Sequence, residues 1–84
     1  MHCVYVLFSG KFNKIYIGET ANLISRFHAH NELANKGYTK KYRPWIVVHV
    51  EFLQTRKAAL AREKTLKSGK GRQWIHNNII PMYR

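Results

Sequence analysis

The sequence contains no aspartate, and its four glutamates face fifteen lysines and arginines, giving a formal net charge of +11 at pH 7. Two-metal nucleases need several clustered carboxylates, whereas Glu19, Glu32, Glu51 and Glu63 are scattered along the chain. One metal site is therefore the most that the acids allow. With 13% aromatic residues, so basic a chain predicts a polyanionic partner, and we expect nucleic acid. The alternatives are a basic protein without a particular partner and, least favoured, binding to an anionic membrane surface, for which the helices lack a long apolar face.

Cysteine and long apolar runs are equally scarce. The single Cys3 excludes an internal disulfide, and no apolar run approaches the length of a membrane span. The N-terminus lacks the charged start, apolar run and cleavage site of a secretion signal. We therefore expect a cytoplasmic protein that forms a single domain over residues 1–84, since this length suits one hydrophobic core.

Two runs rich in β-branched and aromatic residues, Cys3–Ser9 and Lys14–Gly18, flank the turn-forming sequence Gly10-Lys11-Phe12-Asn13. If those four residues form the loop, Tyr5 pairs with Gly18, and directly paired residues share a face of the sheet. The hairpin then has two different faces. Val4, Val6, Phe8, Ile15 and Ile17 form one apolar face, and Tyr5, Leu7, Tyr16 and Gly18 lie on the other.

Further along, Thr20 or Asn22 is expected to cap a helix that ends near residue 30 or 31. Residues 32–44 are typical of a loop with a basic, aromatic second half. Residues 45–52 predict a third strand, in which alternate residues should face a core. These alternate residues are Ile46, Val48, Val50 and Phe52.

The last third of the chain is predicted to be helical. Thr55 should cap the helix Arg56–Lys67, which we expect to end at Gly69-Lys70-Gly71. A short third helix should follow over Arg72–Asn78, and the apolar tail Ile79–Arg84 should fold back on the core. The resulting class is α/β (α+β).

The strand–turn–helix stretch around residues 14–31 has the strongest functional pattern. Tyr16 and Gly18 lie at a strand end, while Arg26 and His30 stand four residues apart and so share one helix face. A hydroxyl, a glycine that permits close approach, an arginine and a histidine together suit the binding of a phosphate. Each residue alone also has an ordinary explanation, because tyrosine is common in strands and arginine on solvated helix faces.

Glu63 has two interpretations. It shares a helix stripe with Ala59 and Leu66, and it precedes Lys67 by four residues. It is therefore either a surface carboxylate paired with Lys67 or the lone ligand of a metal ion at the edge of the buried stripe. Zinc is not expected, because His28 and His30 diverge on a helix and a single cysteine offers no zinc-type spacing.

In their order, these residues resemble the GIY-YIG endonuclease superfamily, and in particular its short stand-alone bacterial members, which are similar to the nuclease domain of the excision-repair incision subunit. Cys3-Val4-Tyr5 is a degenerate form of the first motif that keeps the tyrosine, and Tyr16-Ile17-Gly18 is the second motif intact. The likeness covers nearly the whole chain. It continues through Arg26, His30-Asn31, Tyr38-Thr39-Lys40, Arg43-Pro44-Trp45, Arg62-Glu63-Lys64, the segment 66–72 and Trp74.

This resemblance implies a three-stranded antiparallel sheet flanked by about three helices, and hydrolysis of DNA phosphodiesters with one divalent metal ion, Mg2+ or Mn2+. Tyr5 and Tyr16 would belong to the site, and one of them, with Tyr5 favoured, would position or deprotonate the attacking water. Arg26 would stabilise phosphoryl charge, His30 would assist by hydrogen bonding or proton relay, and Glu63 would bind the metal. A tyrosine base would need its pKa lowered from about 10 towards neutrality, which the surrounding positive charge and the metal would favour. Gly18 and Asn77, or Asn78, are further candidates for support of the site.

Backbone affinity without sequence readout is expected from one set of basic residues. They are Lys40, Lys41, Arg43, Lys67, Lys70 and Arg72. DNA is the expected partner, in a repair setting if the resemblance holds, although RNA is not excluded on the sequence. A protein partner or a homodimer would supply specificity. The alternative function is a binding module of the same fold that does not cleave.

Overall fold

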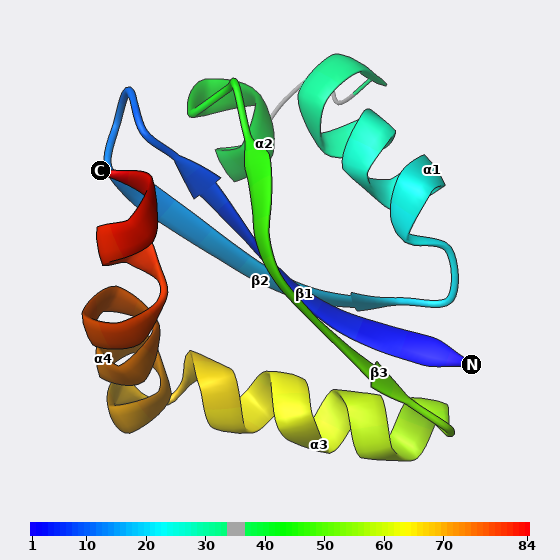
Figure 1. Ribbon diagram of the computed structural model, residues 1–84. Coiled ribbons are helices and arrows are strands. Elements are labelled where there is room, and N and C mark those ends of the chain that lie inside the picture. Colours follow the sequence, from blue (N-terminus) through cyan, green and yellow to red (C-terminus); the bar gives the residue numbers. More distant parts are fainter. Residues whose placement is uncertain (34–36) are drawn as a thin grey trace.

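The computed structural model describes residues 1–33 and 37–84, whose elements are arranged around a small antiparallel sheet (Figure 1). The strands are β1 (His2–Ser9), β2 (Lys14–Thr20) and β3 (Ile46–Leu53). The α-helices are α1 (Leu23–His28), α2 (Tyr38–Lys41), α3 (Arg56–Lys67) and α4 (Gly69–Asn78). Two other helical segments complete the order: the π-helix η1 (Ala29–Leu33) and the 3-10 helix η2 (Ile80–Tyr83). The predicted α+β class and three-stranded antiparallel sheet are confirmed.

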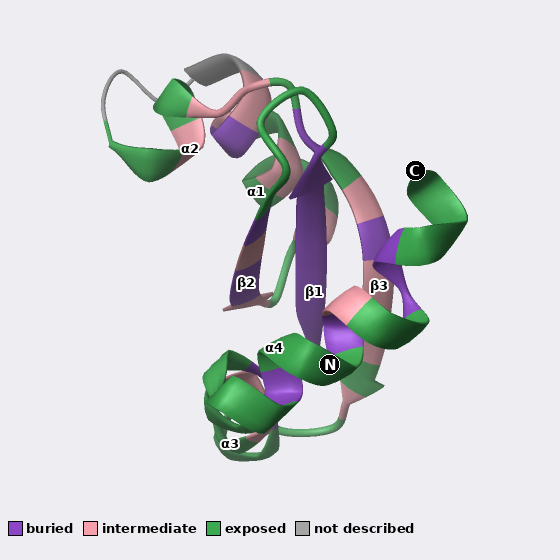
Figure 2. Cartoon of the chain, turned by 90° about the vertical axis from the view of Figure 1, so that its left-hand side faces the viewer, coloured by how far each residue is buried: buried purple, intermediate pink, exposed green. Residues whose placement is uncertain are grey.

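The strand order is β2-β1-β3, so the hairpin's first strand becomes the centre of the sheet. Pairs run from Cys3 opposite Thr20 to Ser9 opposite Lys14, and Tyr5 lies opposite Gly18. The predicted register is therefore confirmed. Figure 2 shows β1 buried along its length between its two neighbours.

Each face of the sheet has its own core, and the helices lie on both sides of it (Figure 1). The first core packs β1 and β2 residues against α3, α4 and η2, and Val4, Ala59, Leu66, Ile75 and Ile80 are buried in it. The second contains Tyr5, Leu7 and Trp45, with Tyr16, Leu23 and Phe27 packed around them. The predicted division of the hairpin into two faces is confirmed. As expected, part of the C-terminal tail joins the core, since Ile79 and Ile80 are buried.

The predicted alternation of β3 is wrong. A β-bulge between Val6 and Leu7 of β1 inserts Val48 as an extra residue, because Leu7 pairs with Val47 and Val6 with His49. Val48 therefore packs in the first core and Val50 in the second. Ile46 and Phe52 are 47% and 68% exposed, since β3 is an edge strand. A bulge disturbs the two-residue period that the prediction assumed.

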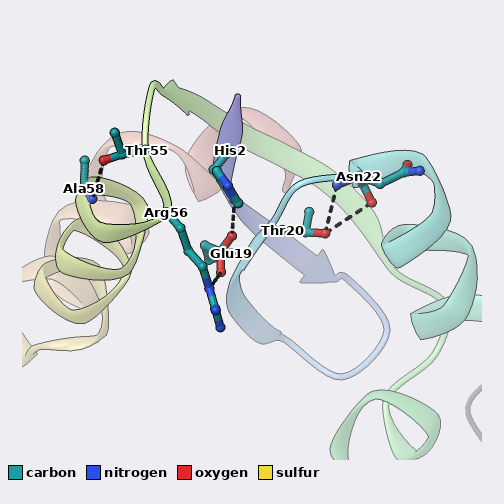
Figure 3. A network of polar contacts seen from close by, with 7 residues as sticks. All are labelled: His2, Glu19, Thr20, Asn22, Thr55, Arg56 and Ala58. Carbon is teal, nitrogen blue, oxygen red and sulfur yellow. Dashed lines mark hydrogen bonds and ion pairs between the residues drawn. The ribbon is translucent and has the colours of Figure 1, made fainter.

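Side-chain caps set the helix starts. The Asn22 side chain accepts from the Ser25 N–H. Figure 3 shows that Thr55 accepts from the Ala58 N–H and that Thr20 accepts from the Asn22 N–H in the preceding turn. Of the two predicted caps for the first helix, Asn22 is thus the one used. This helix changes to π-helical geometry at Ala29.

Two other boundaries differ from the prediction. The end of α3 and the start of α4 meet at Ser68, whose hydroxyl accepts from the Gly71 N–H. Gly69-Lys70-Gly71 therefore begins α4 rather than ending α3, because a serine cap supplies the helix start. The short α2 lies within the stretch predicted as loop, and its Tyr38 hydroxyl donates to the Ile15 carbonyl oxygen.

Glu19 connects the N-terminal strand to α3. Its carboxylate lies 2.9 Å from His2 Nδ1 and 3.7 Å from Arg56 Nε (Figure 3). This acid is therefore occupied by structural contacts. Among the residues that the structure describes, no helix has the length and apolar character needed to cross a membrane.

Candidate active site

The site is centred on the Tyr5 hydroxyl on the second-core face of the sheet. Tyr5 is fully buried in β1, and its hydroxyl lies 2.9 Å from His30 Nε2. The Tyr16 ring centroid lies 4.6 Å from that of His30 and 6.3 Å from that of Tyr5. Two strands and η1 thus bring the three side chains together. His28, by contrast, is exposed, so the two histidines diverge as predicted.

Gly18 makes this arrangement possible. A Cβ atom at this position would collide with the Tyr5 hydroxyl, and it would lie 2.6 Å from Tyr5 Cζ and 3.1 Å from Tyr16 Cε1. Real side chains do not tolerate such separations, so the absence of a side chain is what admits the Tyr5 ring. The glycine of one strand and the tyrosine of the other form one unit.

Arg26 reaches the same point from α1. Hydrogen bonding to the Tyr5 hydroxyl and, more weakly, interaction with Tyr16 raise the pKa of Arg26. Burial, together with the nearby Arg26 charge, lowers the pKa of His30 below its ordinary value of 6.5. The lowered pKa favours the neutral imidazole, in which one ring nitrogen donates and the other accepts, so that Nε2 can accept a hydrogen bond from the Tyr5 hydroxyl in one of its two tautomers. The Tyr5 oxygen accepts from Arg26.

The protein's own positive charge does not lower the pKa of Tyr5. Burial raises the pKa of Tyr5 to about 12, which outweighs its interaction with Arg26. Removal of the hydroxyl from water disfavours the charged phenolate more than one guanidinium favours it. The prediction counted the positive charge and missed the burial.

Glu63 forms the ion pair with Lys67 that the first of its two interpretations predicts. Its charge also acts on the site. Its carboxylate oxygen is 2.6 Å from Lys67 Nζ, and its side chain is 18% exposed. It also contributes to the raised pKa of Tyr5, which places its charge within electrostatic range of that hydroxyl. The described residues contain no cluster of three potential metal ligands. One carboxylate is nevertheless sufficient for Mg2+, which is commonly held by one or two carboxylates plus substrate phosphates and water.

A family model of the GIY-YIG catalytic domain matches residues 1–77. The chain belongs to the GIY-YIG family. It is 34% identical to a UPF0213 protein of Staphylococcus haemolyticus over 80% of both chains. A UPF0213 protein of Bacillus velezensis is 35% identical, over 88% of this chain and 77% of the relative. A third, from Haloquadratum walsbyi, is 36% identical over 80% of this chain and 74% of the relative. The predicted short stand-alone type is thus confirmed.

Membership of the GIY-YIG family places the chain in a family of nuclease-type, DNA-binding domains that generally use a divalent metal. The register gives the two family motifs a physical meaning. The tyrosine of Cys3-Val4-Tyr5 lies opposite the glycine of Tyr16-Ile17-Gly18. Cys3 and Val4, which depart from the family pattern, are buried in the second and the first core respectively. The pairing of Tyr5 with Gly18 is present despite this departure.

The support of His30 in this GIY-YIG domain includes Asn31, which belongs to the motif likeness but for which the sequence predicted no role. The Asn31 side chain donates to the Trp45 carbonyl oxygen at 3.0 Å and accepts from the Trp45 N–H at 2.7 Å. Arg43 Nε donates to the His30 carbonyl oxygen at 3.1 Å. These bonds join η1 to the start of β3. The only signal for this role in the sequence was the position of Asn31 next to His30, since its partner Trp45 is fourteen residues away.

The predicted nucleic-acid-binding residues lie on different elements. Lys40 and Lys41 are exposed on α2, and Lys70 is exposed at the start of α4. Lys67 and Arg72 line a pocket of about 350 Å³ together with Tyr16 and Tyr38. Arg72 also donates to the Lys67 carbonyl oxygen. Asn77 is exposed in the last turn of α4.

Proposed function

We propose that the chain is a metal-dependent endonuclease that hydrolyses DNA phosphodiester bonds. The observation that carries the proposal is the hydrogen-bonded group of Tyr5, His30 and Arg26, built around Gly18. A guanidinium held beside two hydroxyls is preorganised to meet the negative charge that develops on a phosphoryl group under attack. Family membership and the +11 charge favour the same chemistry.

The two tyrosines have different proposed roles. Tyr5 is fully buried and remains protonated at neutral pH, so it acts as a positioning residue that holds His30 and Arg26. Tyr16 is only partly buried, and it lines the pocket that Lys67 and Arg72 also line. We assign to Tyr16 the hydrogen bond that directs the attacking water towards phosphorus.

Glu63 is the residue that would hold the divalent metal. A bound Mg2+ or Mn2+ would supply charge stabilisation for the phosphoryl and leaving oxygens. The bond between Glu63 and Lys67 would be exchanged for the metal, which leaves the lysine free to contact the DNA backbone.

The same ion pair favours a second candidate, a DNA-binding module without cleavage. A carboxylate already bonded to an ammonium at 2.6 Å is neutralised without any metal. In that case the site would bind phosphate through Arg26 and would not hydrolyse it. A partner protein would then supply the chemistry.

Cleavage of labelled duplex, flap and single-stranded DNA, with and without Mg2+ or Mn2+, separates the two. Under the first proposal Glu63→Gln abolishes metal-dependent cleavage while folding and DNA affinity stay within about twofold, because the charge is lost and the shape is kept. Arg26→Ala also abolishes cleavage, through lost stabilisation of the transition state.

The matched control is Glu51→Gln, the same change at a carboxylate that bonds Arg62 and His49. It should lower stability and keep metal-dependent cleavage. If Glu63→Gln cuts at the parent rate, the metal site lies elsewhere. If the parent protein binds every substrate and cuts none, the binding module is the correct function.

A further inference from the structure

A row of aromatic rings leads from the β1–β2 turn to the site. We call Phe12, Tyr42, Tyr38 and Tyr16 the aromatic row. Successive ring centroids are 5.4, 4.8 and 6.3 Å apart, and Tyr16 lies 4.6 Å from His30. The row joins α2 to the edge strand β2, since the Tyr38 hydroxyl of α2 donates to the Ile15 carbonyl oxygen of β2. Figure 2 shows α2 near the turn end of that strand.

The row is open to solvent at its outer end. Phe12 and Tyr38 are 40% and 44% exposed, whereas the neighbouring Trp45 is buried. Exposed rings are costly in water, and Phe12 lies in the β1–β2 turn, outside both cores. Part of the row therefore has faces available to a flat, apolar ligand.

Lysines surround the same rings. Lys11 Nζ lies 5.4 Å from the Phe12 ring centroid, and Lys14 Nζ and Lys41 Nζ each lie 5.4 Å from that of Tyr42. The three carboxylates whose side chains the structure describes, Glu19, Glu51 and Glu63, form their ion pairs with other cations and with none of these lysines. At the inner end, Lys67 and Arg72 line the pocket beside Tyr16 and Tyr38.

We propose that the aromatic row and its lysines bind an unpaired stretch of nucleic-acid strand that enters the site from the turn end of β2. Aromatic rings bind bases by stacking, which requires bases that are not enclosed in a duplex, and lysines follow the backbone. A duplex would engage the lysines and leave the rings without a partner. The inference rests on the proposed function and deepens it: the substrate contains single-stranded DNA or RNA next to the scissile bond.

Binding measured in EDTA tests the inference without requiring cleavage. The probes are a fluorescein-labelled dT15 strand and a hairpin duplex, each titrated by fluorescence anisotropy. Phe12→Leu keeps an apolar side chain and removes the ring, so affinity for dT15 should fall by at least about fivefold and affinity for the duplex by less than twofold. Phe12→Tyr should restore dT15 binding.

Phe52→Leu is the matched control, since Phe52 is also exposed but lies on β3, the opposite edge of the sheet. It should leave both affinities unchanged. A second probe carries one central 2-aminopurine in dT15, whose fluorescence should be quenched by the parent protein and less so by Phe12→Leu. Circular dichroism melts verify that each variant is folded. If Phe12→Leu does not fold, Lys14→Gln is tested in its place with the 2-aminopurine probe. This variant keeps the rings and loses one lysine, so the probe should still be quenched while binding becomes weaker.

Equal losses for strand and duplex, or an unchanged quench in folded Phe12→Leu, would overturn the inference. So would displacement of dT15 by polyglutamate at equal charge concentration, which would indicate an acidic protein ligand. A protein that cuts duplex DNA and fails these tests would support the proposed nuclease function and refute strand binding by the aromatic row. A protein that passes these tests and cuts no substrate would support strand binding by the aromatic row and refute the proposed nuclease activity.

Discussion

The substitution Gly18→Ala tests whether the fit between two strands controls the site. The added Cβ would lie 2.6 Å from Tyr5 Cζ and would collide with the hydroxyl. Tyr5 is fully buried, so its ring has no open space to move into. Overpacking of this kind costs about 1–3 kcal/mol of unfolding free energy. At about 4–8 °C for each kcal/mol, the melting temperature should fall measurably.

The effect on cleavage should exceed the effect on stability. The ring can relieve the collision only if the Tyr5 hydroxyl moves away from His30 Nε2 and Arg26, and a displacement of about 1 Å at a reacting centre costs about 100-fold in rate. Rates are compared by single-turnover cleavage at a temperature where both proteins are folded. Tyr5→Phe combined with Gly18→Ala removes the nearer of the two colliding atoms and leaves Cζ at 2.6 Å, so part of the collision is relieved and the two losses of stability should be less than additive.

Gly69→Ala is the matched control, because a Cβ at Gly69 meets nothing within 4 Å. It adds the same methyl group at the start of α4 and should leave the rate unchanged and stability equal or slightly higher. Parent-like cleavage by Gly18→Ala, with a melting temperature within 1–2 °C of the parent, would refute the argument that Gly18 sets the position of Tyr5.

Two further predictions concern pH and salt. Because the folded-state pKa of His30 is lowered, its contribution to stability is complete above about pH 6.5 and is lost as the pH falls. The cleavage rate should decline over the same acidic range. His30→Asn should remove this decline from the pH–rate profile. Because the pKa of Tyr5 is raised to about 12, its contribution is complete below pH 10 and is lost as the pH rises towards 12, which urea titrations across this range measure. Lys40→Gln or Lys70→Gln should weaken DNA binding equally for different sequences and reduce the slope of log K against log salt by about one; loss of a sequence preference would contradict a backbone contact.

The hairpin and the position of its tyrosines were predictable because a four-residue loop and a two-residue period leave little choice of register. The start and end of α3 were equally accessible, since Thr55 is a strong cap and the helical pattern that follows is regular. From these, together with the motif likeness, the approach of Arg26 and His30 to Tyr5 could be expected.

What could not be predicted depends on contacts between distant parts of the chain. The pKa of Tyr5 depends on complete burial, which requires Trp45, η1 and Gly18 all in place. The bond between Asn31 and Trp45 links residues fourteen apart in the sequence through a side chain, and no periodicity encodes it. The extra residue in β3 is invisible as well, because a valine-rich strand reads the same with or without a bulge.

Because of the extra residue Val48, β3 has one residue more than it has pairing partners in β1. Val47 before it and His49 after it lie opposite adjacent residues of β1, so Val48 adds to the chain without adding to the ladder. A chain with this fold that is one residue shorter here would retain every partner of β1, including the pairing that places Glu51 beside Arg62. The extra residue thus lies on an edge strand, whereas the two tyrosines are set by the pairing of β1 with β2 on the other side of β1.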